Sequence, residues 1–197
     1  MPIYNVTMGQ AISIHNIGAD TLMTGCDVKS GLMSCSAIIL FNRANGAAGL
    51  YHYPSGDIRA RPSSQQVLRE MMENISPTDC HVVYGAEDLT SNPFSFGFAR
   101  DAEPTDPYHD HLLLHLRSLG LNPRTVAAGG SRSASVSLAG GTWTVSRDMP
   151  DGAVQNLAGR ANAHGLPWCR IYWSMMAPFK LRPRLAFTTT RSGCVIL

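Results

Sequence analysis

The chain has 197 residues, 44% hydrophobic and 15% charged, and this length suits one domain with a sizeable core. A formal net charge of +2 is too small for the basic surface of a nucleic-acid-binding protein, so we expect no nucleic-acid partner. The five cysteines include no C-x-x-C pair, which argues against a disulfide framework or zinc ribbon and favours free thiols in a reducing compartment.

Apolar stretches with strand periodicity recur along the chain. "AISIHNIG" (11–18) alternates apolar and polar residues and predicts a first strand. Two hairpins are predicted, one across the loop "NRANG" and one across Gly140-Gly141. The remaining predicted strands span 35–41, 47–53, 80–86, 133–140 and 141–147.

Two amphipathic helices are predicted. The first, "SSQQVLREMMENI" (63–75), begins at Ser63 with Gln66 three residues later, the pattern of a capping box. The second, "DPYHDHLLLHLRSLG" (106–120), has Asp106 as its cap and Pro107 at its first position, and it ends at Gly120 as a left-handed cap. Apolar residues share one face of the first helix: Val67, Leu68, Met71, Met72 and Ile75.

This order of elements predicts an α+β fold, a mostly antiparallel sheet or two-layer sandwich with the two main helices packed on it. The pattern changes after about Asp148. We therefore expect a domain over 1–148 and, over 149–197, a C-terminal extension packed on or covering it. The first residues lack the basic and apolar regions of a Sec signal, and no apolar run is long enough to span a bilayer, so a cytoplasmic location is expected.

The first hairpin carries a thiol where it opens, at Cys35, and an imidazole where it closes, at His52. A nucleophilic cysteine needs a base within reach. Adjacent strands lie about 5 Å apart, so a hairpin can bring the two side chains together. Backbone N–H groups of "GLMSC" would be available as an oxyanion hole. The alternative is a buried cysteine acting as a small hydrophobe beside a structural histidine.

The stretch "GLMSCSAIILFNRANGAAGLYHYPSG" (31–56) resembles the signature of the chemoreceptor glutamine deamidases, the CheD family. Residues 116–147 are similar to that family's helix, Gly-Gly-x-x-x-Arg-like turn and terminal hairpin, so the resemblance covers roughly residues 10–148. The residues that match the signature are Gly31, Leu32, Ser34, Cys35, Gly49, His52 and Pro54.

The resemblance implies a CheD-like fold and a protein-glutamine deamidase, an activity shared with toxins of the cytotoxic necrotizing factor type. Cys35 would be the nucleophile and His52 the base, with no metal or other cofactor. The family usually has a threonine six residues before the cysteine, where this chain has Lys29. Ser30, Ser34 or Thr24 would have to replace it. Glycines of the signature are also replaced, by Met33 and Ala48.

The expected partner is a protein that exposes a glutamine, acted on by a monomer. A cysteine protease, a transglutaminase or another acyltransferase would use the same pair of side chains. A non-catalytic interaction module that keeps the fold is the alternative from a different class.

The last four residues, "CVIL", match a C-a-a-X prenylation box at Cys194, and a basic stretch precedes them. An apolar C-terminus that packs explains them equally well. With prenylation, the expected protein is an effector that enters a host cell by a non-Sec route and associates with membranes there. Small GTPases would then be candidate substrates.

Other candidate groups favour ordinary structural roles. The side chains of His109, His111 and His115 fit a solvated helix start as well as a metal site, so no metal is expected. Cys80 and His81 are adjacent on a strand and should face opposite sides. His164 lies in a loop-like stretch and is a weaker candidate for a general base.

Overall fold

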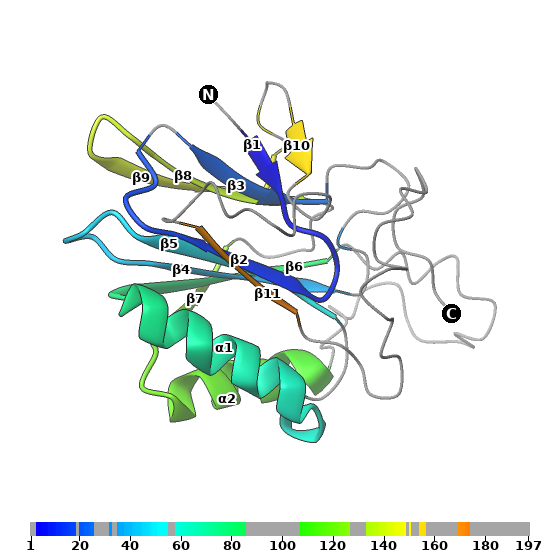
Figure 1. Cartoon of the computed structure of the whole chain (residues 1–197). Coiled ribbons are helices and arrows are strands. Elements are labelled where there is room, and N and C mark those ends of the chain that lie inside the picture. Colours follow the sequence, from blue (N-terminus) through cyan, green and yellow to red (C-terminus); the bar gives the residue numbers. More distant parts are fainter. Residues whose placement is uncertain are drawn as a thin grey trace.

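The computed structural model describes residues 3–18, 20–25, 32, 35–54, 58–85, 107–126, 133–148, 150, 154–156 and 169–173. These residues form three layers: a five-stranded outer sheet, a six-stranded central sheet and a layer of two helices (Figure 1). The α+β prediction is confirmed. The two sheets are mixed rather than purely antiparallel, because the strand pairs β1–β3, β1–β10 and β6–β7 are parallel.

The outer sheet has the order β10-β1-β3-β8-β9 and the central sheet the order β11-β2-β5-β4-β6-β7. The outer strands are β10 (Val154–Asn156), β1 (Ile3–Asn5), β3 (Thr21–Thr24), β8 (Ala134–Ala139) and β9 (Thr142–Ser146). The central strands are β11 (Cys169–Trp173), β2 (Gln10–Ile14), β5 (Ala48–Tyr53), β4 (Ser36–Phe41), β6 (Asp79–Tyr84) and β7 (Pro123–Thr125).

The inner strands β2, β5 and β4 of the central sheet are buried on both faces, so they are largely apolar on both sides. Along β5, Ala48 and Leu50 belong to the core between the sheets, whereas Tyr51 and Tyr53 belong to the core under the helices. This alternation assigns each side chain of the strand to one of the two faces. His52, between the two tyrosines, therefore faces the outer sheet.

Helix α1 (Pro62–Ile75) packs against β5 at Gly49. A Cβ atom at Gly49 would lie 2.5 Å from Ile75 Cδ1 and 2.9 Å from Met71 Sδ, closer than carbon atoms normally approach. The glycine that matches the deamidase signature thus has a packing role, because it lets the helix approach the strand.

The predicted capping box at Ser63 is wrong. Helix α1 begins at Pro62 with Arg61 as its N-cap, and no side chain caps it. Proline at the first position has no N–H to satisfy and has its φ angle fixed near the helical value, which explains the earlier start. The Gln66 amide instead donates to Glu70 Oε1 at 2.8 Å. The predicted apolar face is otherwise confirmed, with Met72 half-buried.

Helix α2 (Pro107–Ser118) begins at the predicted proline, and Gly120 after it has a φ of +81°, as predicted for a left-handed cap. Asp106 lies outside the described residues. The hairpin β8–β9 turns at Gly140 and Gly141, whose φ angles are +56° and +79°. This is the two-residue turn expected from the sequence.

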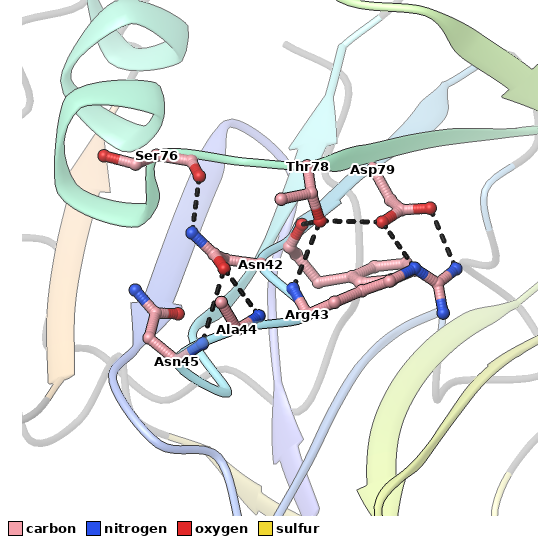
Figure 2. Close-up of polar contacts among 8 residues, drawn as sticks. Asn42, Arg43, Ala44, Asn45, Ser76, Thr78 and Asp79 are labelled. Atoms are coloured by element: carbon pink, nitrogen blue, oxygen red, sulfur yellow. Dashed lines mark hydrogen bonds and ion pairs between the residues drawn. The ribbon is translucent and has the colours of Figure 1, made fainter.

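The tip of the β4–β5 hairpin is fixed to the end of α1 and the start of β6, as Figure 2 shows. Asn42 Nδ2 donates to the carbonyl oxygen of Ser76 at 2.6 Å, and Asn42 Oδ1 accepts the Ala44 N–H at 2.8 Å. The Arg43 guanidinium donates to both carboxylate oxygens of Asp79, at 2.8 and 2.9 Å. These bonds hold the hairpin in one register, which also determines what meets at its open end.

The prediction missed five short strands: β1, β3, β7, β10 and β11. In the stretch after residue 148, β10 pairs with β1, and β11 pairs with β2 at the edge of the central sheet. The described part of the chain contains no helix long and apolar enough to cross a membrane.

Candidate active site

Cys35 and His52 lie on the same face of the central sheet, in the core between the sheets. Ala37 of β4 is directly opposite His52, and Cys35 precedes Ala37 by two residues on the same face. Cys35 is therefore the diagonal neighbour of His52, a relation in which Cα atoms lie about 7–8 Å apart and long side chains meet. Both side chains are buried, with 6% of Cys35 and 2% of His52 exposed.

Thr24 on β3 links His52 to the outer sheet. Its Oγ1 lies 2.6 Å from His52 Nδ1 and donates its proton to the carbonyl oxygen of Val6, also at 2.6 Å. A hydroxyl has one proton, so Thr24 must accept from Nδ1–H. The network thus assigns the ring proton to Nδ1 and leaves the lone pair on Nε2.

Nε2 of His52 is buried and has no hydrogen-bond partner among the described residues. In particular, Cys35 Sγ does not bond to it in the free protein. Catalytic hydrogen bonds are often long before the substrate binds and shorten in the complex. A buried, unpartnered Nε2 beside a thiol is what a general base for that thiol requires.

Burial lowers the pKa of His52 from 6.5 to about 4, and a hydrogen bond to the Val6 backbone opposes this shift in part. Desolvation disfavours the imidazolium ion, so the ring is neutral near pH 7. A neutral ring can accept a proton from the thiol, as a general base must.

The backbone N–H and carbonyl groups of Cys35 already form hydrogen bonds within the protein. The Cys35 N–H donates to the carbonyl oxygen of Leu32, and the Cys35 carbonyl accepts the Gly85 N–H at 2.8 Å. The N–H of Cys35 is therefore not available as an oxyanion donor in this conformation. Residues 31, 33 and 34 of "GLMSC" lie outside the described residues.

Of the three hydroxyl residues suggested by the sequence as replacements for the family threonine, Thr24 contacts His52. Ser30 and Ser34 lie outside the described residues. Thr24 is the last residue of the four-residue strand β3. The β-branched residues of this strand favour β-structure and could have predicted it from the sequence. Thr24 is 28 residues from His52 along the chain, and their contact arises only when the two sheets stack, so no local pattern predicts it.

The other candidate groups do not converge on a site. Arg59 Nη2 lies 3.2 Å from His111 Nδ1, and a guanidinium there opposes a metal cation. Among the described residues, no three histidine, cysteine, aspartate or glutamate side chains lie together in a way that could hold a metal ion. Cys80 and His81 face opposite sides as predicted: Cys80 lies in the helix-side core, where burial raises its thiol pKa to about 12, and His81 stacks on Phe41. His164, Cys194 and the side chain of His109 lie outside the described residues.

A surface depression of 440 Å³ lies at the tips of the two hairpins, lined in part by Arg43, Asn45 and Trp143. The guanidinium of Arg43 is already paired with Asp79, and the hydrogen bond lowers the pKa of that carboxyl group. The depression is at the opposite end of the β4–β5 hairpin from Cys35, so it is not part of the candidate active site.

No protein-family model matches the chain, and a search of curated proteins finds no match either. The chemistry must therefore be argued from the site itself. A buried thiol, a neutral imidazole whose Nε2 is unpartnered, and a hydroxyl that orients the imidazole are the components of nucleophilic catalysis through a thioester.

Proposed function

We propose that the protein is a protein-glutamine deamidase that uses Cys35 as nucleophile and His52 as general base, with Thr24 as the positioning residue. The observation that carries the proposal is the Nδ1 contact with Thr24, which leaves the lone pair of His52 on Nε2, on the face that carries Cys35. The resemblance of residues 31–56 to the deamidase signature supports the same assignment.

The reaction would run in two steps. His52 Nε2 takes the proton of the Cys35 thiol, and the thiolate attacks the carbon of the side-chain carboxamide. The tetrahedral intermediate collapses as His52 returns the proton to the departing nitrogen, which leaves as ammonia. Water, deprotonated by His52, then cleaves the thioester, releasing glutamate and restoring the thiol.

The burial of both side chains favours a side-chain amide over a peptide bond as the substrate. A nucleophile that is 6% exposed is reached by a slender, unbranched group more readily than by two flanking lengths of backbone. A glutamine side chain on a protein surface has this shape and carries the amide at its end. Protease activity is disfavoured for the same reason.

The test compares wild type with Cys35→Ala and, as matched control, Cys80→Ala. Cys80 is also a buried free thiol, but it lies in the core under the helices. Candidate protein substrates, small GTPases first, are followed by ammonia release and intact mass. We expect wild type and Cys80→Ala to release ammonia and to add about one dalton per modified glutamine, and Cys35→Ala to do neither.

The rate of alkylation by iodoacetamide provides a readout that needs no substrate. Cys35 should be alkylated faster in wild type than in His52→Ala, because the imidazole takes up the thiol proton. Equal rates would contradict the proposed pair. Incorporation of a primary amine into the substrate, instead of hydrolysis, would reassign the protein as a transglutaminase.

A further inference from the structure

Gln10, the first residue of β2, is fully buried, with 0% of its surface exposed. Its Nε2 group has no hydrogen-bond partner among the described residues. A buried amide donor without an acceptor loses its hydrogen bonds to water and gains none in return, so such groups are rare and need an explanation.

The orientation of the amide is fixed by Thr7. The backbone N–H of Thr7 lies 3.1 Å from Gln10 Oε1, and the Thr7 hydroxyl lies 3.4 Å from the same atom. A backbone N–H can only donate, so the atom that faces it must be the oxygen of the amide. The NH₂ group consequently points away from Thr7, with both of its protons free.

Gln10 lies beside His52 on the face that carries Cys35. Gln10 alternates with Ala11, which belongs to the helix-side core, and is in step with Ile12, which belongs to the core between the sheets. The register that pairs Ala11 with Tyr51 brings Gln10 and His52 to the next position, and the Gly9 N–H donates to the His52 carbonyl at 2.9 Å. The residue with the buried free donor is thus the cross-strand neighbour of the residue with the buried free acceptor.

These two atoms are complementary to a carboxamide. Its oxygen accepts hydrogen bonds and becomes negatively charged during attack, while its nitrogen must receive a proton to leave. His52 Nε2 serves the nitrogen in the proposed reaction. The oxygen needs a donor, and the N–H of Cys35 already bonds to Leu32. A side-chain amide can fill this role.

We propose that Gln10 is a catalytic residue whose Nε2–H group donates a hydrogen bond to the carbonyl oxygen of the substrate carboxamide and stabilises the oxyanion. This inference rests on the proposed function, because it assigns a role within the same reaction. Thr7 is the positioning residue that holds the amide with its donor side toward the site.

The variants Gln10→Met and Gln10→Glu remove the donor and keep the length of the side chain. Gln10→Glu also keeps an oxygen for the Thr7 N–H. We expect kcat for ammonia release to fall about 100-fold or more in both, the usual loss for one oxyanion donor. Ser13→Ala is the matched control, since Ser13 is a buried polar residue on the opposite face of the same strand, where its Oγ accepts from Asn74.

A second probe separates this role from a structural one. N,N-dimethyl-5-oxopentanamide carries an aldehyde where a glutamine side chain has its carboxamide. Addition of the Cys35 thiol gives a hemithioacetal whose oxygen occupies the oxyanion position, and this addition protects Cys35 from iodoacetamide. Alkylation itself develops no oxyanion. Gln10 variants should therefore lose aldehyde affinity about 100-fold while free Cys35 is alkylated at the wild-type rate.

Wild-type aldehyde affinity in both Gln10 variants would overturn the role of Gln10 and leave the deamidase proposal standing. An equal loss of alkylation rate and aldehyde affinity would also overturn it, because Gln10 would then support the fold around Cys35. Absence of aldehyde addition in the wild type would count against carbonyl chemistry at Cys35 altogether, and so against both proposals.

Discussion

The hydroxyl group of Thr24 has a single proton, and the carbonyl of Val6 accepts it. His52 must then donate from Nδ1, so one small residue determines which ring nitrogen can act as the base. The contact also links the two sheets, because Thr24 belongs to the outer sheet and His52 to the central sheet. His52 is thereby held by its own strand in the central sheet and by a hydrogen bond to the outer sheet.

Replacing Thr24 by valine keeps the shape of the side chain and removes the acceptor for Nδ1–H. We expect ammonia release to slow by about tenfold or more, a part of the 10²–10⁴ that a positioned base contributes. Two-bond proton–nitrogen spectra should show the Nδ1–H tautomer of His52 in wild type and lose this preference in Thr24→Val. Thr24→Ser keeps the hydroxyl and should restore both. Wild-type activity in the valine variant would remove Thr24 from the mechanism.

The sequence located part of this site. Cys35 and His52 were predictable because a hairpin places its two open ends side by side, and local pairing of this kind is visible in the chain order. Thr24 was one of three hydroxyl residues suggested by the sequence, and Gln10 was not predicted, because their contacts depend on how two sheets stack and on where β2 begins. Such contacts join elements that no short-range pattern relates.

Close approach of α1 to β5 is the feature of the fold that most constrains the elements around the site. Gly49 precedes His52 by three residues and faces the helix. A side chain there would push α1 and β5 apart, and β5 carries His52, the proposed base. The glycine therefore connects the packing of the helix layer to the position of His52.

Gly49→Ala should lower the free energy of unfolding by about 1–3 kcal/mol, the usual cost of overpacking. Ile75→Val removes the atom that the new methyl group would meet first, at 2.5 Å. The double variant should therefore lose less stability than the sum of the two single variants, since neighbouring changes couple. Denaturant unfolding measures all three. If the losses of unfolding free energy in the two single variants simply added in the double variant, the new methyl group would not be clashing with Ile75, and the predicted close contact would be contradicted.

Among the elements, the longer alternating strands and the two helices were predicted, whereas β1, β3, β7, β10 and β11 were not. Each of these five has between three and five residues, too few to show a clear period. Several also pair in parallel with strands distant in sequence. No short hairpin turn connects such strands, so the sequence has no turn signal that would predict them. For the same reason the strand order of the outer sheet was not predicted, because β1 and β3 are two of its three interior strands.

At the scale of the whole molecule, His52 is an ionisable group enclosed between two layers. Its pKa is lowered from 6.5 to about 4 by burial, so the folded protein resists protonating it. The unfolded chain has no such burial and takes up a proton near pH 6.5. Folding and proton binding therefore oppose each other between these two values.

The stability of the protein should accordingly fall as the pH decreases from about 6.5 to about 4. The contribution of His52 is fully present above pH 6.5, and the shift corresponds to a loss of about 3 kcal/mol on reaching pH 4. Asp79 titrates outside this window, because its pKa is lowered from 3.8 by the hydrogen bond from Arg43. His81, whose pKa burial also lowers from 6.5, adds to the decline, and Asp20, whose pKa burial raises from 3.8, opposes it at the lower end. The part of the decline that disappears when His52 is replaced is therefore the contribution of His52.

Urea unfolding at a series of pH values tests this for wild type, His52→Gln and Ile39→Val. The glutamine variant has no group to protonate and should lose most of the slope. Ile39 lies in the same inter-sheet core, so its shortening should lower stability by about 0.5–1.5 kcal/mol at every pH and leave the slope unchanged. A slope as steep in His52→Gln as in wild type would mean that the pKa of His52 is not lowered and that its imidazole is accessible to water in the folded protein. It would then be mostly protonated below pH 6, and deamidation should show an acidic limb near pH 6.5 instead of near pH 4.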